Sequence, residues 1–204
     1  FVLSILVISE DDCQLLFDLL DQDSPQLVKQ FLKGKPRNLD LTGCLRNNCN
    51  PFLFSVEKST PEIIELIRDY TDKKTHQSTT SDGYNSLFVA AKRGSVEVLD
   101  ILLKTKVDRN FVANDTTTAL FIACQNRREE FVKRLSKKVT KTTLNYQSEV
   151  PEDEDCYTPL MLAVKNDLSS IAKLLLDNKA DIFVQSGKKG KSALDLAILS
   201  SINE

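Results

Sequence analysis

The residue types that most often do chemistry are few in this chain and poorly spaced for it. The 204 residues include one histidine, His76, and five cysteines without any C-x-x-C pair. A nucleophilic or metal site needs such side chains beside a base or in tight ligand pairs, and His76 lies in a polar segment with no identifiable partner. The cysteines are Cys13, Cys44, Cys49, Cys124 and Cys156. We expect free thiols in a reducing compartment, no metal, no cofactor and no intrinsic catalysis.

Three charged segments are the remaining candidates for binding chemistry. The acidic segment 148–155 has five carboxylates but neither the alternating ligands nor the glycine of a calcium loop. It is either a solvated loop or a contact with a partner. Segment 187–191, Gly-Lys-Lys-Gly-Lys, lacks phosphate-loop spacing, and its glycines favour a tight turn. Segment 127–141 carries seven basic residues, which either pair with the acidic segment or bind phosphate or RNA.

The amino-acid composition further narrows the possible classes of protein and partner. The chain is 41% apolar, with only 6 Gly and 6 Pro, which argues against a β-rich or disordered protein. A net charge of −2 and a single aromatic in the basic segment, Phe131, argue against a nucleic-acid partner. The apolar run 1–8 is too short to cross a bilayer, so we expect no membrane insertion. Because the chain lacks an initiator Met, we expect a piece of a longer protein that starts inside the outer helix of an earlier unit. We also expect a monomeric, cytoplasmic protein.

The elements that would position any site come from an internal repeat. Five polar residues each precede a small residue or proline and then a large apolar one, at spacings of 35, 33, 40 and 34 residues. They are Asn50, Asn85, Thr118, Thr158 and Ser192. Each is a good helix N-cap, and Pro51 and Pro159 fall on the first helical position, where a missing N–H costs nothing. A period in this range predicts stacked units rather than one closed core.

The clearest unit spans 82–112. Asn85 caps a first short helix that ends near Gly94, and apolar residues at helical spacing predict a second helix over 96–103. Residues 83–94, Gly-Tyr-Asn-Ser-Leu-Phe-Val-Ala-Ala-Lys-Arg-Gly, resemble the ankyrin repeat pattern G-x-T-P-L-H-x-A-A-x-x-G. Further copies, in decreasing order of likeness, are 157–164, 118–124, 192–197, 50–56 and 14–16.

This resemblance implies an all-α ankyrin-repeat solenoid of stacked helix-turn-helix units with finger loops. We expect one domain, 1–204, of about six repeats that start near 11, 47, 82, 115, 155 and 189, with 1–10 as a remnant of a preceding unit or an N-terminal cap. The last helix is expected over 193–198. The family's histidine is replaced at Leu53, Phe88, Phe121, Met161 and Asp195. We therefore expect apolar contacts in place of the family's hydrogen bonds between units.

The same resemblance implies a non-catalytic scaffold or adaptor that binds a partner protein through its concave face and fingers. The two residues after each small pair should face the concave side, and their net charge of +3 favours an acidic peptide or helix. The alternative is that they are ordinary solvated positions. The candidate contact residues are Lys58, Tyr84, Lys92, Arg93, Asp115, Gln125, Asn126, Glu152, Asp153, Lys165, Asn166 and Lys188. Two other functions stay open: the cytosolic regulatory domain of an ion channel, and the targeting domain of a larger ubiquitin ligase or kinase.

Overall fold

Helical hairpins make up most of the regular structure. The computed structural model describes residues 8–37, 39–150 and 155–202. The chain divides into two compact units, of which the first ends at Asp108 and the second begins at Arg109. In both units, pairs of short helices are joined by tight turns, and the loops that connect successive pairs form fingers. The all-α repeat architecture predicted from the sequence is confirmed. That the repeats form a single domain stays a prediction.

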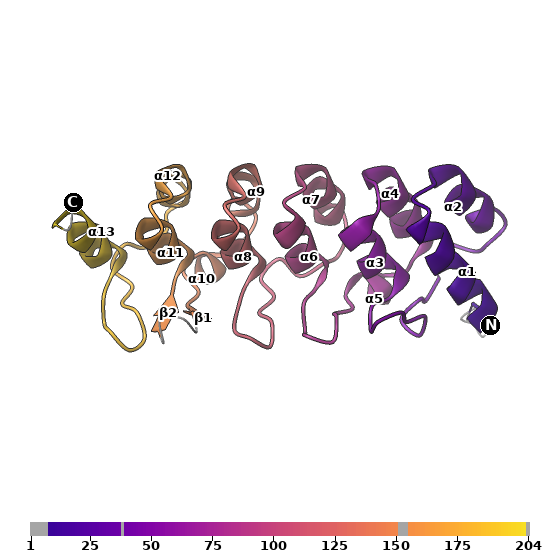
Figure 1. Cartoon of the computed structure of the whole chain (residues 1–204), viewed down its shortest axis with the longest axis horizontal. Helices are drawn as coiled ribbons and strands as arrows, with labels where there is room; N and C mark the ends of the chain where they lie inside the picture. The colour runs from indigo at the N-terminus through magenta and orange to yellow at the C-terminus, as the bar shows by residue number, and fades with distance from the viewer. Residues whose placement is uncertain (1–7, 38, 151–154, 203–204) are drawn as a thin grey trace. The chain divides into compact units, whose positions relative to one another are not determined.

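Over residues 8–37 and 39–108, the first unit contains three helical hairpins and one additional short helix. The hairpins are α1 (Glu10–Asp21) with α2 (Pro25–Leu32), α3 (Pro51–Lys58) with α4 (Pro61–Tyr70), and α6 (Ser86–Arg93) with α7 (Val96–Leu103), and the short helix is α5 (Lys73–His76). Helices α1, α3 and α6 pack side by side in one row, and α2, α4 and α7 pack in another (Figure 1). Ser9 caps α1 through a bond from the Asp12 amide, so this hairpin begins next to the predicted position 11.

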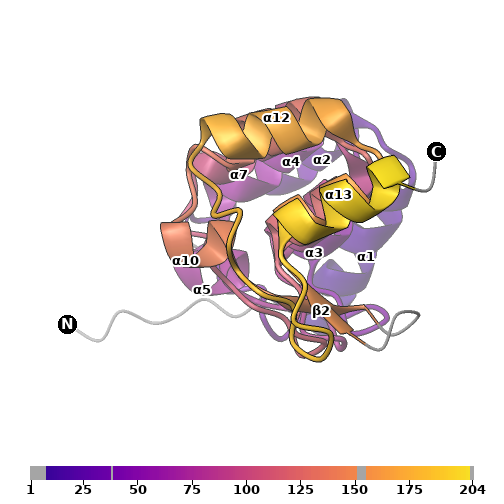
Figure 2. The ribbon, with the colours of Figure 1, turned by 90° about the vertical axis from the view of Figure 1, so that its left-hand side faces the viewer.

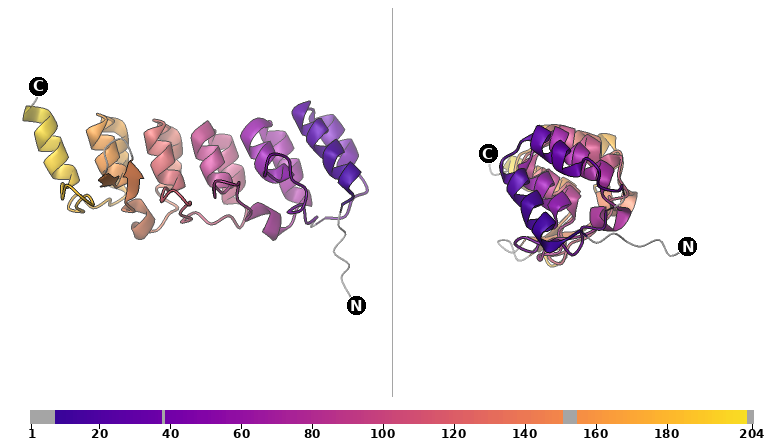
Figure 3. Two further views of the ribbon diagram at one scale, coloured as in Figure 1. Left: turned by 60° about the horizontal axis from the view of Figure 1, so that its bottom comes forward. Right: turned by 90° about the vertical axis from the view of Figure 1, so that its right-hand side faces the viewer.

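The second unit repeats this arrangement with a longer finger. Its helices are α8 (Ala119–Gln125) with α9 (Glu129–Leu135), the short α10 (Lys141–Leu144), α11 (Pro159–Lys165) with α12 (Ser169–Asp177), and α13 (Ala193–Ile202). The rows are α8, α11 and α13, and α9 and α12 (Figure 3, left). The finger before α11 contains an antiparallel pair, β1 (Ser148–Val150) and β2 (Asp155–Tyr157), which Figure 2 shows away from α12. Helix α13 ends four residues beyond the predicted Ile198.

All five repeated polar residues cap a helix, as predicted. The Asn50 Oδ1 atom accepts from the Leu53 amide at 2.9 Å, and the hydroxyl of Thr118 accepts from the Phe121 amide at 3.2 Å. Asn85 and Thr158 do the same for α6 and α11. At the last cap, Ser192 accepts from the Asp195 amide, while the Asp195 carboxylate accepts from the Ser192 amide and hydroxyl. Each cap satisfies amides that a helix start leaves without partners.

A large apolar residue lies at a fixed position after each cap. The large residue two positions after the cap is at most 1% exposed in four repeats, at Phe52, Leu87, Leu120 and Leu160. In the fifth repeat Leu194 is 46% exposed, because α13 has no paired second helix within 8–37, 39–150 and 155–202. Full burial of such a side chain contributes about 1.5–3 kcal/mol. The repeats therefore derive their stability from packing against their neighbours.

Hydrogen bonds between successive repeats are present, which corrects the expectation that apolar contacts replace them. The Leu41 amide donates to the Thr75 hydroxyl oxygen at 3.0 Å, across the repeat boundary near 47. The asparagine caps add bonds within their own repeats: the Nδ2 group of Asn50 donates to the Thr75 carbonyl at 3.1 Å, and that of Asn85 donates to the Asp108 carbonyl at 2.9 Å. An asparagine amide can cap its own helix through oxygen and still donate through nitrogen. Each cap residue therefore ties its helix to the segment that leads out of the same repeat.

His76 has partners that its polar segment did not reveal in the sequence. It ends α5 and is 9% exposed, with its ring centroid 4.6 Å from that of Phe52. Its Nε2 atom lies 2.8 Å from the Thr71 hydroxyl, which itself donates to the Ile67 carbonyl at 2.8 Å. The ring nitrogen must then be the donor to Thr71. Burial lowers the pKa of His76 and favours the neutral ring.

Candidate partner-binding surface

The C-terminal ends of the first helices carry most of the predicted contact residues. In each repeat, the apolar side of the helix packs inward and its last turn reaches the solvent. The exposed residues at these ends are Lys58, Lys92, Gln125, Asn126, Lys165 and Asn166. Their exposure agrees with the predicted placement, and their role in binding stays a prediction.

Two of these lysines are held over aromatic rings. The ammonium of Lys58 lies 5.1 Å from the centroid of Phe54, and that of Lys165 lies 5.2 Å from the centroid of Tyr157. Such cation–π contacts contribute about 0.5–1 kcal/mol at exposed sites. They restrict the two side chains while leaving ammonium donors accessible. A carboxylate-bearing partner would therefore meet charges that are already positioned.

Arg93 makes contacts within the protein that the sequence did not predict, and its role in binding stays a prediction. Its Nη1 atom donates to the carbonyls of Val56 at 3.0 Å and of Ser59 at 2.8 Å. These carbonyls end α3, where the last turn of a helix lacks partners of its own. The guanidinium thus joins the end of α6 to the end of α3, and its charge is directed into the protein. The exposed charges at these positions of the first unit are therefore Lys58 and Lys92, with Glu57 beside Lys58.

The predicted finger residues serve mainly to shape their own loops. Tyr84 is half-buried and stacks on Phe88, with 5.2 Å between the ring centroids. The Asp115 carboxylate accepts from the Thr117 amide at 3.1 Å and from its hydroxyl at 2.6 Å, which closes a turn. The side chain of Lys188 is exposed at the tip of the last finger. Glu152 and Asp153 lie outside the described residues, so the choice between a solvated loop and a partner contact stays open.

The last finger folds around a buried carboxylate. Its Gly-Lys-Lys-Gly-Lys segment forms the predicted turn, in which the Ser186 amide donates to the Lys191 carbonyl at 2.9 Å. Asp155 in β2 is 3% exposed, and its Oδ1 atom accepts from the amides of Cys156 and Lys188, each at 2.8 Å. Burial alone would raise the pKa of Asp155, but these amides, with further bonds from Ser186 and Lys189, lower it overall. The protein itself thus supplies the anion that this glycine-rich loop binds.

The basic segment 127–141 pairs in part with its own helix. On α9, Glu130 accepts from Lys133 at 3.1 Å and faces Arg134 at 3.5 Å. The hydrogen bond from Lys133 lowers the pKa of Glu130. Arg127, just before α9, has a left-handed backbone with φ of 56°. These pairs are exposed, so they stabilise the helix only weakly.

The cysteines require a correction. Cys13 and Cys44 form a disulfide, with 5.5 Å between their Cα atoms, where free thiols were expected. Their positions 31 residues apart gave no signal of proximity. Cys49, Cys124 and Cys156 are free thiols. Cys124 is fully buried, and burial raises its pKa.

Two further chemical features can be stated for the described part of the chain. Over residues 8–37, 39–150 and 155–202, no three His, Cys, Asp or Glu side chains come together in a way that could hold a metal ion. Within the same ranges, the helices are all too short or too polar to cross a membrane. The arrangement offers exposed polar and basic side chains on a rigid support, which is suited to recognising another macromolecule.

Comparison with known proteins identifies the family. The family model described as ankyrin repeats (3 copies) matches residues 56–148 and, in a second match, 103–186. The chain therefore belongs to the ankyrin-repeat family, a general protein–protein interaction fold.

Its similar proteins are longer and carry other named domains. The chain is 32% identical over 108 residues to human Ankyrin repeat and SOCS box protein 11. The matched stretch covers 53% of this chain and 31% of that protein. Its mouse counterpart is 32% identical over 112 residues, or 55% of this chain and 32% of that protein. An Ankyrin repeat and KH domain-containing protein of Caenorhabditis briggsae is 23% identical over 172 residues, or 80% and 6% of the two chains. The chain thus spans a third or less of each of these relatives.

Proposed function

We propose that this chain is a non-catalytic adaptor or scaffold module that presents a preformed surface to a partner protein. The observation that supports the proposal is that, at the ends of the first helices, some polar side chains bond within the protein and their neighbours are exposed. Arg93 bonds the end of α3, and Asn126 bonds the Ile122 carbonyl of α8 at 2.9 Å, while the neighbouring lysines and amides are exposed. Because the support is already ordered, binding loses little conformational entropy.

The partner that best fits is an acidic peptide or helix. Lys58 and Lys92 in the first unit and Lys165 in the second are exposed cations, and Gln125, Asn126 and Asn166 add hydrogen-bonding groups. Charge complementarity of this kind raises association rates and excludes wrong partners. Its location in the cytoplasm and its monomeric state stay predictions, and the Cys13–Cys44 disulfide is a bond that reducing compartments disfavour.

Charge reversal tests this proposal. Lys58→Glu with Lys92→Glu, and separately Lys165→Glu, should each weaken capture of the partner in quantitative pull-downs and lower affinity in calorimetric titration. Lys173→Glu is the matched control, because Lys173 is exposed on α12, a second helix. The far-UV circular dichroism of all variants should be unchanged. Equal affinity of the control and the two test variants would exclude the basic surface as the contact.

A second candidate is the targeting domain of a larger ligase. It is favoured by the similarity to proteins named for ankyrin repeats together with a SOCS box. In that case the surface described above would select the protein to be acted on, and the chemistry would belong to another part. A ligase-associated domain encoded in the same reading frame would support this candidate, and its absence from the full-length protein would exclude it.

A further inference from the structure

The first finger, residues 39–49, is attached to α1 at two points. One is the disulfide between Cys13 on α1 and Cys44 on the finger. The other is Arg46, whose guanidinium donates to Asp18 at 2.5 Å and to Asp21 at 2.6 Å and stacks 4.8 Å from the ring of Phe17. The two attachments differ chemically: the covalent one responds to thiols, and the ionic one does not.

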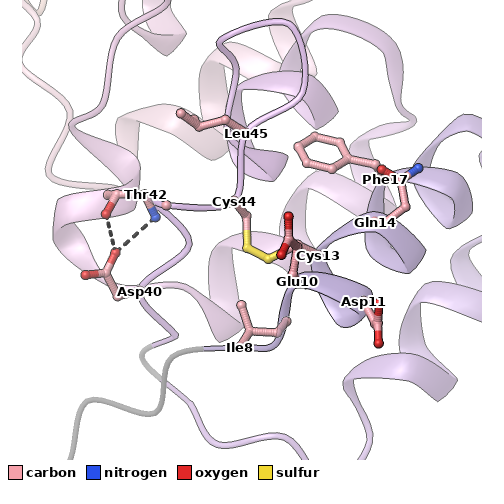
Figure 4. Close-up of a pocket in the computed structure, with 11 residues that line it drawn as sticks. Ile8, Glu10, Asp11, Cys13, Gln14, Phe17, Asp40, Thr42, Cys44 and Leu45 are labelled. Carbon is pink, nitrogen blue, oxygen red and sulfur yellow. Dashed lines mark hydrogen bonds between the residues drawn. A yellow bond between two sulfur atoms is a disulfide. The ribbon is translucent and has the colours of Figure 1, made fainter.

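The disulfide joins the two walls of an open hollow of about 830 Å³. One wall is α1, with Glu10, Asp11 and Gln14, and the other is the finger, with Thr42 and Leu45 (Figure 4). Leu45 is 59% exposed at the rim. The width of this hollow therefore depends on whether the bond between its walls is closed.

We propose that the Cys13–Cys44 bond is a thiol–disulfide exchange site at which a low-molecular-weight thiol enters at Cys13. Both cysteines border the hollow, but Cys13 is half-buried whereas Cys44 is only 3% exposed. An incoming thiolate can thus reach Cys13 Sγ from the solvent, and Cys44 is the leaving group. Thiol attack on a disulfide requires such access to one sulfur.

The exchange balances without any group beyond the thiol. A thiolate forms a bond to Cys13 Sγ as the bond to Cys44 Sγ breaks, and Cys44 departs as a thiolate that takes up a proton. A second thiolate attacks the outer sulfur of the mixed disulfide, which releases the Cys13 thiolate, itself protonated, and the oxidised small-molecule disulfide. Two thiols have then been oxidised and one protein disulfide reduced. The reverse exchange, with the small-molecule disulfide as oxidant, closes the bond.

The neighbouring groups favour an external thiol over the free cysteine of the same finger. Cys49 is half-buried, and burial, followed by the charges of Glu57 and Asp82, raises its pKa and keeps it protonated. A protonated thiol is a poor nucleophile. At the entry side, Glu10 and Asp11 precede Cys13 and should repel an anionic thiolate more than a zwitterionic thiolate that has no net charge.

The first experiment counts thiols and follows the finger. In protein oxidised in air, maleimide labelling after unfolding should modify Cys49, Cys124 and Cys156 only, and dithiothreitol should expose two more thiols. Reduction should raise hydrogen exchange over 41–45 by about tenfold or more, because a local tether is lost. Cys49→Ser should behave like the wild type, and Cys13→Ser should show the raised exchange before reduction. The wild-type reduction keeps the test valid if Cys13→Ser does not fold.

The second experiment identifies the entry point. Glutathione attacks as an anionic thiolate and cysteamine as a zwitterion without net charge, so added salt should accelerate reduction by glutathione much more than reduction by cysteamine. Glu10→Gln with Asp11→Asn should reduce this difference, while the Asp40 carboxylate still lines the hollow. Five free thiols in the air-oxidised protein, or exchange over 41–45 unaffected by reduction, would overturn the proposal. An equal salt dependence for the two thiols would overturn entry beside these carboxylates at Cys13.

Discussion

The guanidinium of Arg93 on α6 lies 3.0 Å from the Val56 carbonyl oxygen on α3, and the same nitrogen reaches the Ser59 carbonyl. One side chain thus satisfies the end of a helix in the preceding repeat. Bonds from a charged donor to otherwise unpaired carbonyls contribute more than neutral ones. This contact makes Arg93 part of the packing between two neighbouring repeats.

Arg93→Gln should therefore lower the free energy of unfolding by about 1.5–3 kcal/mol, the range for hydrogen bonds to charged groups. Urea unfolding followed by circular dichroism measures the change. Lys92→Gln is the control, because Lys92 is the exposed neighbour on the same turn, and it should shift stability by about 0.5 kcal/mol or less. Equal losses in the two variants would contradict the capping role of Arg93.

Arg127→Gly should stabilise the second unit. Arg127 follows α8 with φ of 56°, and the residue that follows α6 with the same backbone is Gly94, with φ of 80°. Glycine adopts this left-handed conformation without the steric cost that a side chain carries, so we expect a gain of about 0.5–1 kcal/mol after the added flexibility of the unfolded chain. Thermal unfolding should show a higher midpoint, and Gly94→Ala should lower it. A lower midpoint for Arg127→Gly would show that its side chain makes a stabilising contact.

His76 should make the first unit less stable as pH falls below neutrality. Its pKa is lowered by burial in the folded state, so between that pKa and the unfolded value of 6.5 only the unfolded chain binds the proton. Stability is therefore complete above pH 6.5 and decreases as pH falls through this window. The urea midpoint of the wild type should drop between pH 7 and 5.5, and that of His76→Gln should change less. Parallel pH profiles would contradict the buried neutral ring.

Asp155→Asn should loosen the last finger. The carboxylate accepts hydrogen bonds from amides of both β2 and the finger, and its pKa is lowered overall despite its burial. The oxygen of an asparagine side chain is a weaker hydrogen-bond acceptor than a carboxylate, and the NH₂ group of that side chain cannot accept hydrogen bonds from these amides. Hydrogen exchange at the Lys188 amide should accelerate in Asp155→Asn, while the exposed control Asp177→Asn on α12 should leave it unchanged. Unaltered protection at Lys188 would mean that the turn is stable without the carboxylate.

The sequence alone predicted the features that local interactions specify. Asn50, Asn85 and Thr158 were identified as caps because a cap bonds an amide two or three residues away. The spacing of the leucines predicted which helix faces are buried. This too is a local property, because helix geometry determines within a few residues which side chains share a face.

Only the tertiary structure decided the partners that lie far apart in the sequence. Arg93 meets Val56, Cys13 meets Cys44, and His76 packs on Phe52, each across more than twenty residues. Nothing in the local pattern distinguishes Arg93 from the exposed Lys92 beside it. The distinction arises because stacking places one side chain against unpaired carbonyls and leaves the other in solvent.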